Sequence, residues 1–271
     1  MCELLGISSN LPATVDLSLN RFAQHGGRTG RHHDGWGIAY FEGRDVRLIK
    51  EAEAAADSAW IRFLNAHSLR SPLVVAHVRH ATVGVRSYAN TQPFLRELGG
   101  HAQVFAHNGD LPALADTPYS STHRFQAIGE TDSERAFCLL LDRLAGCWQD
   151  AAEIPTLERR LDAVAGFATI LREYGPANFL YADGDVLFAH GDRRFNTATR
   201  RTSAPGLVTL GRWCRGDERG FVTDGLVVGG TAQMITLIAS VPLTDEAWEP
   251  LSEGEVIAVT AGRIVARRPV A

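Results

Sequence analysis

The sequence predicts an α+β fold, in which strands and helices are segregated along the chain. Short apolar, β-branched stretches joined by glycine-rich turns fill the first 110 residues. Two amphipathic helices then follow one another, and apolar strands return after residue 178. A run of strands followed by a run of helices favours sheets with segregated helices over alternating βαβ units.

Four strands are expected in the first part of the chain. Each is a short apolar run bounded by turn residues, as is typical of buried strands. The last of them ends in Asn108-Gly109, a pair that favours a turn because both residues tolerate positive φ. The expected ranges are 3–7, 35–41, 73–79 and 103–107.

Two helices are expected next. Thr131 and Glu134 fit a capping box, and apolar residues recur behind them at helical spacing as far as Leu144. The second helix is expected over 156–174, where Gly175-Pro176 stops it. Strands are then expected at 179–182, 186–189, 207–210, 234–241 and 256–260, with a hairpin at 183–185 joining the first two.

The composition is that of a folded globular chain. It has 271 residues, of which 45% are hydrophobic, and a formal net charge of −4. This length allows one large or two small domains. A nucleic-acid partner is not expected, because binding a polyanion requires a basic field. Cationic residues cluster in one place, which we interpret as a solvated face or hairpin: Arg193, Arg194, Arg200 and Arg201.

Membrane insertion and secretion are not expected. The longest apolar stretches fall far short of the roughly 20 residues that span a bilayer. The first residues carry no Lys or Arg before Arg21 and do not resemble a signal peptide. The four cysteines match neither a CxxC pair nor a disulfide framework, so we expect a reducing cytoplasm.

Cys2 is the first candidate for chemistry. Removal of the initiator methionine would leave a cysteine that carries both a thiol and an α-amine. Their reference pKa values lie near 8.5 and 7.7–8.0, so the deprotonated amine could accept the thiol proton. Nucleophile and base would then share one residue. The alternative is that Cys2 is an early residue without a catalytic role.

Arg79 stands at the end of a predicted buried strand and leads into a loop. A guanidinium at this place can hold a carboxylate bidentately, or can pair structurally with a distant acidic residue. His77 and His80 are three residues apart on a predicted strand, so alternation turns them to opposite faces. We therefore expect no zinc site.

Two further segments carry polar groups at the edge of predicted elements. The Asn108 side-chain N–H and the Gly109 backbone N–H could both point at one oxygen, as in an oxyanion hole. The alternative is an ordinary Asn-Gly hairpin turn. Asp132 could bind an ammonium group, or could be a helix-end carboxylate that interacts with the helix dipole.

Taken together and in this order, these motifs resemble the class II glutamine amidotransferases, in particular the stand-alone YafJ-like branch. The resemblance implies an N-terminal-nucleophile (Ntn) hydrolase fold, a four-layer αββα sandwich of two antiparallel or mixed sheets flanked by helices. It also implies a single type-2 amidotransferase domain over residues 2–271. The motifs are Met1-Cys2, His33-Asp34-Gly35-Trp36-Gly37, His77-Val78-Arg79, Asn90-Thr91-Gln92-Pro93-Phe94, His107-Asn108-Gly109 and Gly129-Glu130-Thr131-Asp132-Ser133-Glu134.

By this resemblance, Cys2 is the nucleophile and its α-amine is the base. The thiolate attacks the side-chain amide of glutamine, and the side chain of Asn108 with the N–H of Gly109 stabilises the oxyanion. Ammonia leaves, a glutamyl thioester remains, and water releases glutamate. The resemblance implies no cofactor and no metal.

The resemblance also assigns substrate-binding residues. Arg79 matches the residue that holds the substrate α-carboxylate, and Asp132 matches the residue that binds the α-ammonium group. Thr82 falls where a loop of the family contributes a polar contact. A zwitterionic amino acid needs one cation and one anion held apart, which agrees with this pair.

The chain departs from the family pattern at three positions. Gln92 stands where family members commonly have histidine, His80 where synthase members usually have tryptophan, and His25 where relatives have arginine. These departures bear on how the site closes over its substrate. Residues 81–93 are expected to form a mobile lid, with a plain surface loop as the alternative.

The resemblance leaves the ammonia acceptor open. Class II amidotransferases usually pass ammonia to a fused synthase domain, for which this chain ends too soon. The implied uses are a separate ammonia-accepting synthase subunit, glutaminase activity, or hydrolysis of another γ-glutamyl compound. Two other readings are a non-catalytic regulatory module with retained Met1, and an amidase for acylated lactones or penicillin-like amides that would not need Arg79.

Overall fold

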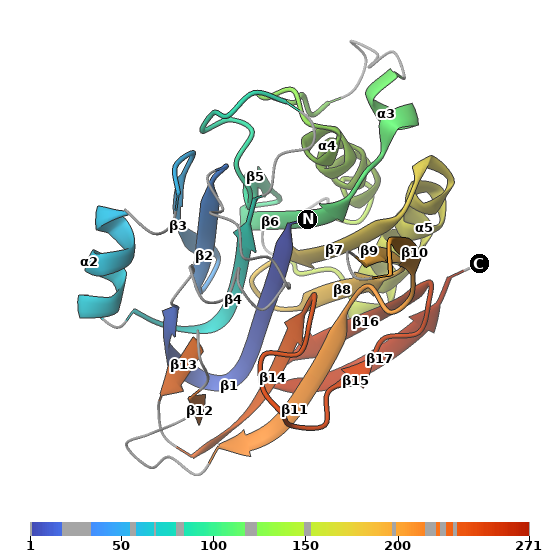
Figure 1. The fold of residues 1–271 in the computed structure, drawn as a ribbon. Coiled ribbons are helices and arrows are strands. Elements are labelled where there is room, and N and C mark those ends of the chain that lie inside the picture. The colour runs from blue at the N-terminus through green and yellow to red at the C-terminus, as the bar shows by residue number, and fades with distance from the viewer. Residues whose placement is uncertain are drawn as a thin grey trace.

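Two β-sheets form the centre of the structure, a computed structural model (Figure 1). It describes residues 2–17, 34–54, 58–67, 69–79, 84–116, 124–148, 153–196, 199–214, 221–222, 226–229 and 232–270. In the first sheet the order is β15-β11-β14-β1-β4-β2-β3, and β13 pairs with both β1 and β12. These strands are β1 (Glu3–Leu17), β2 (Trp36–Glu42), β3 (Asp45–Glu51), β4 (Arg70–Val78), β11 (Val208–Cys214), β12 (Phe221–Val222), β13 (Leu226–Gly229), β14 (Gln233–Ala239) and β15 (Glu249–Pro250).

The second sheet has the order β17-β16-β8-β7-β6-β5. Every strand pair in the described part of both sheets is antiparallel. The strands are β5 (Phe94–Leu98), β6 (His101–Gly109), β7 (Ala177–Ala182), β8 (Leu187–Gly191), β16 (Glu255–Thr260) and β17 (Arg263–Pro269). A separate hairpin consists of β9 (Arg194–Asn196) and β10 (Arg201–Ser203).

The two sheets pack face to face through a shared apolar core. Leu4 and Val75 of the first sheet belong to the same buried cluster as Val104, Leu180 and Ile257 of the second. This alternation of inward-facing apolar residues is what strand periodicity produces on one face of a sheet. The core therefore fixes the relative position of strands that are distant in sequence.

Helices cover the outer faces of the sandwich (Figure 1). Ile61 and Leu64 of α2 (Ala59–His67) pack on the first sheet. Phe137 of α4 (Asp132–Leu144) and Phe167 of α5 (Leu157–Tyr174) pack against Phe105 of the second sheet. The short helix α3 (Pro112–Asp116) follows β6. The order of layers is helix, sheet, sheet, helix, which confirms the αββα sandwich.

The described strands and helices confirm most of the expected elements. The strands expected at 3–7, 35–41, 73–79 and 103–107 lie within or overlap β1, β2, β4 and β6. The two helices are α4 and α5, and the hairpin at 183–185 joins β7 to β8. Within the described residues, the prediction missed α2, α3 and several strands, among them β3, β5 and β17.

The start of α4 is built as its sequence predicts, with one change. Thr131 is the N-cap, and its hydroxyl accepts a hydrogen bond from the Glu134 N–H at 3.3 Å. The Glu134 carboxylate accepts instead from the Gly129 N–H at 2.6 Å and from Arg96 Nη2 at 2.5 Å. This buried carboxylate therefore ties the segment before the helix to β5.

The arginine cluster is partly a solvated hairpin. Arg200 and Arg201 are exposed at the β9–β10 hairpin, as expected. The side chain of Arg194 is largely buried and forms an ion pair with Glu3 at 3.1 Å, so for this residue the expectation of a solvated face is wrong.

Among the helices of the described residues, none has the length and apolar character that a membrane span needs.

Arg160 of α5 supplies a stability test. Its guanidinium is buried and pairs with Asp183 at 2.8 Å and Asp185 at 2.7 Å. Because Asp183 is fully buried, Asp183→Ala should lower the free energy of unfolding by about 3 kcal/mol, measured by urea unfolding. Asp185 is half exposed, so Asp185→Ala should cost less than about 1 kcal/mol. Equal losses in the two variants would contradict this account.

Candidate active site

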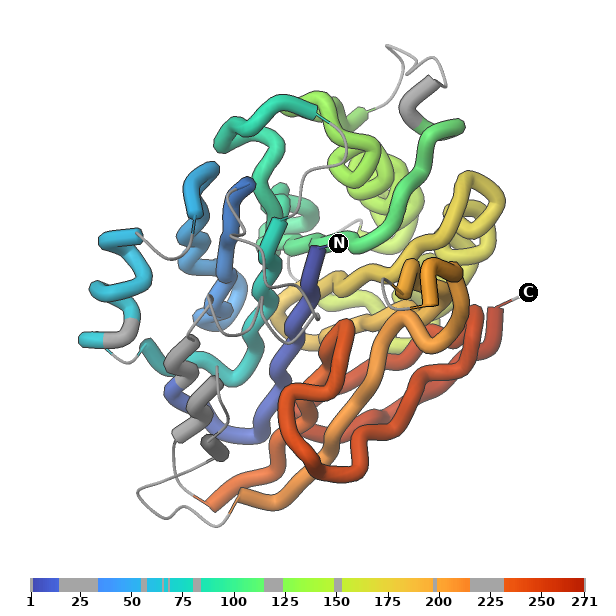
Figure 2. The backbone as a smooth tube through the Cα atoms, viewed as in Figure 1, coloured from blue at the N-terminus to red at the C-terminus, as the bar shows by residue number. Residues whose placement is uncertain are grey.

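The start of β1, the ends of β4 and β6 and the start of α4 meet at one place (Figures 1 and 2). Glu3 pairs with Val78 in the antiparallel ladder of β1 and β4. Cys2, which precedes Glu3, and Arg79, which follows Val78, therefore lie side by side. Asn108 Nδ2 donates a hydrogen bond to the Cys2 carbonyl oxygen at 2.7 Å. Cys2 therefore lies beside two segments that are distant from it in sequence, the end of β4 and the end of β6.

The beginning of β1 is firmly anchored. The Leu4 N–H donates to Ser240 Oγ at 3.0 Å, and the Ser240 N–H donates to the Leu4 carbonyl at 3.1 Å. Arg194 binds the Ser240 carbonyl oxygen at 2.7 Å and the Glu3 carboxylate at 3.1 Å. These contacts fix the backbone next to Cys2, whose side chain is only partly buried.

Asn108 and Gly109 do not form the expected turn. Both belong to β6, where they pair with Asn178 and Ala177 of β7, and neither has positive φ. Pairing with β7 extends the ladder through the Asn-Gly pair, and this long-range contact overrides its local preference. The hairpin-turn alternative is therefore wrong. Gly109 is required for another reason, since a Cβ there would lie 2.0 Å from the Pro176 carbonyl oxygen.

Asn178 holds the end of β6 from behind. Its Nδ2 donates to the Asn108 carbonyl oxygen at 3.2 Å and to the Arg193 carbonyl oxygen at 2.8 Å. Its Oδ1 accepts from the Asp192 N–H at 2.8 Å. Because Asn178 is buried and bonded at both ends, it fixes the backbone from which the Asn108 side chain projects.

Arg79 is buried at the end of β4. Its guanidinium donates to the carbonyl oxygens of Asp34, Val85 and Gly84 at 3.4, 3.3 and 3.2 Å. Burial lowers the pKa of Arg79, and the charges of Cys2 and Asp34 oppose that lowering. Arg79 therefore lies within electrostatic range of Cys2.

Asp132 is the first residue of α4 and is also buried. Its Oδ2 accepts from the Leu111 N–H at 2.8 Å, and its Oδ1 accepts from the Ser133 N–H at 2.7 Å. The helix-end position anticipated for Asp132 is thus what the structure has. Leu111 lies three residues after Asn108, so the same short segment contacts both Cys2 and Asp132.

The other predicted site positions are described only in part. Thr82, His80 and His25 lie outside the described residues. Gln92 is described, and its Oε1 accepts the backbone N–H of His107 at 2.6 Å. The residue that departs from the family pattern therefore contacts the strand that carries Asn108.

The described part of the expected lid, residues 84–93, makes several hydrogen bonds. Asn90 Nδ2 donates to the Val85 carbonyl oxygen at 2.9 Å, and its Oδ1 accepts from the Glu130 N–H at 2.8 Å. Lys50 Nζ donates to the Thr91 carbonyl oxygen at 2.7 Å. Burial lowers the pKa of Lys50 to about 8, and the charge of Glu134 opposes this shift.

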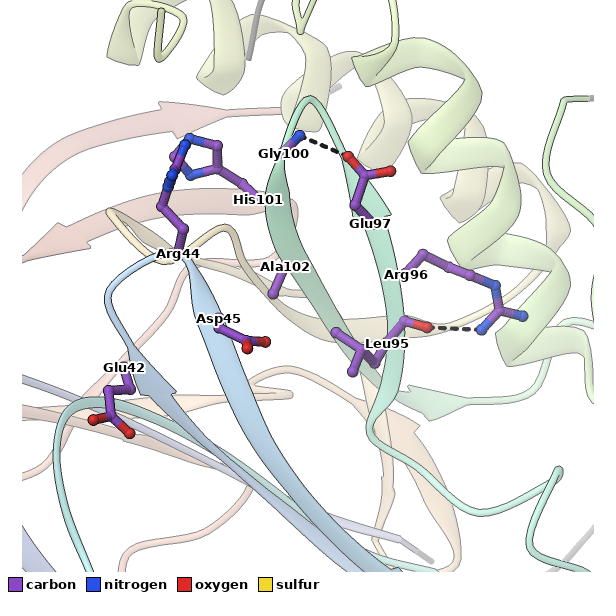
Figure 3. A pocket seen from close by; sticks show the side chains of 9 residues that line it. All are labelled: Glu42, Arg44, Asp45, Leu95, Arg96, Glu97, Gly100, His101 and Ala102. Carbon is purple, nitrogen blue, oxygen red and sulfur yellow. Dashed lines mark hydrogen bonds between the residues drawn. The ribbon is translucent and has the colours of Figure 1, made fainter. Parts of the chain in front are cut away.

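An open cavity of about 720 Å³ lies elsewhere (Figure 3). It lies between the β2–β3 turn and the β5–β6 hairpin, and none of the predicted catalytic or substrate-binding residues lines it. Its charged and polar lining residues are of mixed sign: Glu42, Arg44, Asp45, Arg96, Glu97 and His101.

Three buried histidines of the sandwich give a pH prediction. Burial lowers the pKa of His77 to about 3, with Arg79 adding to the shift, and lowers those of His107 and His190 to about 4. In the unfolded chain these rings have pKa values of about 6.5. The unfolded state therefore binds more protons below about pH 6.5, and the free energy of unfolding should decrease as the pH falls from about 6.5 to about 4.

Urea unfolding at several pH values checks this prediction. In His190→Gln the free energy of unfolding should depend less steeply on pH over the same window, because unfolding then takes up to about one proton fewer. A free energy of unfolding that stays constant from about pH 7 to about pH 4.5 would contradict the prediction.

The comparisons with known proteins identify the family. A family model described as "Glutamine amidotransferases class-II" matches residues 1–270. The chain belongs to the class II glutamine amidotransferases. One relative is the protein named "Putative glutamine amidotransferase YafJ" from Escherichia coli (strain K12). It is 36% identical to this chain over 260 residues, and the match covers 94% of this chain and 96% of YafJ. A relative from Haemophilus influenzae is 33% identical over 267 residues, and the match covers 98% of this chain and 86% of that protein.

Solved structures agree with this assignment. The 2.0 Å crystal structure of a predicted glutamine amidotransferase from Pseudomonas aeruginosa PA01 has a TM-score of 0.71 and 33% identity, and the match covers 97% of this chain and 99% of that one. Glutamine phosphoribosylpyrophosphate amidotransferase from B. subtilis has a TM-score of 0.58 at 17% identity, over 98% of this chain and 49% of that chain. This second likeness shows the fold alone. The class II glutamine amidotransferases act on glutamine, so the family places the chain among enzymes.

Several residues of the site were not singled out from the sequence. Ser133 and His107 lie inside quoted motifs, but nothing in the motifs indicates that they contact each other. Ser240 follows the end of β14 and Asn178 lies at the start of β7, and only the packing of distant strands brings both to Asn108.

Proposed function

We propose that this protein hydrolyses the side-chain amide of L-glutamine, with the Cys2 thiol as nucleophile and the Cys2 α-amine as base. The observation that carries the proposal is the convergence of a thiol, an amide donor, a guanidinium and a carboxylate from four separate segments. Asn108 contacts Cys2, Arg79 lies beside it, and Asp132 is bonded to the segment that follows Asn108.

The reaction requires the removal of Met1, which releases the α-amine of Cys2. The amine accepts the thiol proton, and the thiolate forms a bond to the amide carbon. When the tetrahedral intermediate collapses, the C–N bond breaks and the nitrogen leaves as ammonia with the transferred proton. Water then cleaves the glutamyl thioester to glutamate and restores the thiol.

Asn108 Nδ2 and the Gly109 N–H are proposed to stabilise the oxyanion. The Asn108 amide has two N–H groups, one of which donates to the Cys2 carbonyl oxygen at 2.7 Å. The other, among the described residues, makes a long 3.4 Å contact with Ser240 Oγ. The negatively charged oxygen is the better acceptor, so it would replace Ser240 in this second contact.

Arg79 and Asp132 are proposed to bind the substrate α-carboxylate and α-ammonium group, with Thr82 as a further polar contact. Both charged side chains are buried, which strengthens their interaction with a zwitterion. The Arg79 guanidinium donates hydrogen bonds to neutral carbonyl oxygens, and a carboxylate is a stronger acceptor than these.

The proposal also covers the domain organisation, the cellular location and the fate of the ammonia. Residues 2–271 act as one amidotransferase domain, and the protein works in the cytoplasm, where its thiols stay reduced. Ammonia is either released or passed to a separate synthase subunit.

An ammonia-release assay tests the proposal. Protein whose N-terminus has been checked by intact mass is incubated with L-glutamine, with γ-glutamyl amides and with a non-glutamyl amide. Release from L-glutamine supports the proposal. Release from another γ-glutamyl compound alone would change the substrate, and turnover of the non-glutamyl amide that persists in Arg79→Ala would indicate a general amidase. Retained Met1 with no turnover of any amide would indicate a non-catalytic module.

A further inference from the structure

The imidazole of His107 is buried between two parts of the site. His107 precedes Asn108 on β6, and its ring lies against Gly109. A Cβ added to Gly109 would lie 2.7 Å from Nε2 and 3.0 Å from Cε1 of that ring. The ring is therefore in van der Waals contact with the backbone that carries the proposed oxyanion donor.

The other side of the same ring faces the start of α4. His107 Nδ1 lies 2.9 Å from Ser133 Oγ, and Ser133 Oγ lies 3.3 Å from Asp132 Oδ1. A carboxylate only accepts hydrogen bonds, so the Ser133 hydroxyl donates to Asp132. The hydroxyl then accepts from an Nδ1–H of His107, which assigns the tautomer.

This arrangement requires a neutral imidazole. In the Nδ1–H tautomer, Nε2 carries a lone pair, and it has no hydrogen-bond partner among the described residues. A proton on Nε2 would be a buried donor without an acceptor in the described part of the site, which is costly. Burial lowers the pKa of His107 to about 4 against the opposing charge of Asp132.

We propose that His107 is a positioning residue that connects the oxyanion site on β6 to the ammonium-binding carboxylate of α4. Through Ser133 it orients Asp132 and so sets the preference for substrates with an α-ammonium group. The proposal rests on the proposed function for the identity of the substrate. His107 itself contacts neither the substrate nor the reacting atoms in it.

The charge distribution explains why a hydrogen-bond chain suits this task. Asp132 already accepts two backbone N–H groups, and a hydroxyl adds a third donor without bringing a formal charge. The carboxylate therefore stays anionic and keeps its attraction for an ammonium group, while its orientation is fixed. A lysine or arginine in place of the hydroxyl would compete with the substrate for the same charge.

Binding to a chemically inert protein tests the proposal. In a Cys2→Ala background, calorimetry measures the dissociation constants of L-glutamine and of glutaric acid monoamide, which lacks only the α-amine. Ser133→Ala should raise the dissociation constant of L-glutamine by roughly 10- to 100-fold, the usual effect of losing a hydrogen bond to a charged group. Binding of the monoamide should change less than about threefold.

Variants at position 107 separate positioning from packing. His107→Asn keeps an N–H near the place of Nδ1 and should retain most of the preference for L-glutamine, whereas His107→Leu should lose it as Ser133→Ala does. His190→Leu is the matched control, because His190 is equally buried on β8 and its Nδ1 contacts the Glu255 carbonyl oxygen instead. This control should leave the preference unchanged.

The outcomes are distinguishable. Equal weakening of both ligands in Ser133→Ala, or a preference that survives His107→Leu, would overturn the role of His107. Absence of L-glutamine binding to the unsubstituted Cys2→Ala protein, together with no ammonia release by the wild type, would instead overturn the proposed function.

Discussion

Replacing Cys2 by serine should reduce ammonia release from L-glutamine by about 10³-fold or more. A serine hydroxyl is a far weaker acid than a thiol, so the α-amine cannot generate the alkoxide that the reaction would need. Removing the nucleophile of a serine protease costs about 10⁶-fold in kcat, and a serine at position 2 leaves a weak nucleophile in place of the thiol. Initial rates of ammonia release at saturating L-glutamine measure the effect.

Cys147→Ser is the matched control for this variant. Cys147 is also partly buried, but it follows α4 and its thiol contacts the Arg159 carbonyl oxygen at 3.8 Å. Its replacement should leave the rate within about twofold of wild type. A Cys2→Ser protein that keeps more than about a tenth of the activity would show that another group attacks the amide.

Replacing Asn108 by alanine should lower kcat by about 10²- to 10³-fold, with a smaller change in KM. An oxyanion donor acts mainly in the transition state, and removal of one such donor has this typical effect. Steady-state kinetics with L-glutamine separate the two constants. Unfolding by urea shows whether Asn108→Ala retains the fold, since the same side chain also contacts Cys2.

Asn10→Ala provides the comparison for Asn108→Ala. Asn10 lies on β1, and its Oδ1 accepts the Met234 N–H at 2.8 Å near the opposite end of that strand's pairing with β14. We expect kcat within about twofold of wild type for this variant. A drop of less than about fivefold in Asn108→Ala would argue that Gly109 or another donor carries the oxyanion alone.

The sequence predicted those elements whose signals are local. The Thr131 cap and the apolar spacing behind it define α4, and both are visible without any tertiary contact. The strand around residues 73–79 is a continuous apolar run because it is buried on both faces, against Leu4 and its neighbours on one side and the α2 layer on the other.

The elements that were missed lack such signals. β3 is only partly buried, and its sequence, DVRLIKE, is interrupted by charged residues. β17 is an edge strand with four exposed positions, which gives it no apolar run to recognise. In both cases pairing with a neighbouring strand, rather than local propensity, determines the structure.

The Asn108-Gly109 segment shows how tertiary pairing overrides turn propensity. Its composition is typical of a tight turn, yet both residues are held in β6 by β7, more than 60 residues later in the chain. No local pattern could predict this register. The consequence for function is large, because an extended Asn108 projects its side chain toward Cys2 rather than into a hairpin loop.

The candidate site was predicted as a set of residues but not as a geometry. Cys2, Arg79, Asn108 and Asp132 were chosen by chemistry and by resemblance, and the fold brings them together through strand order. The connection from His107 through Ser133 to Asp132 depends on how α4 packs on β6, which is a side-chain contact across 26 positions of sequence. Such contacts leave no periodic trace in the chain.

The central claim is that the thiol of an N-terminal Cys2 becomes acylated by the substrate. Mass spectrometry of the N-terminal peptide, from active protein mixed with L-glutamine and quenched rapidly in acid, tests it directly. The account predicts a peptide that begins at Cys2 and carries one glutamyl group on its sulfur. An active protein that retains Met1, or whose glutamyl group is found on another residue, would contradict it.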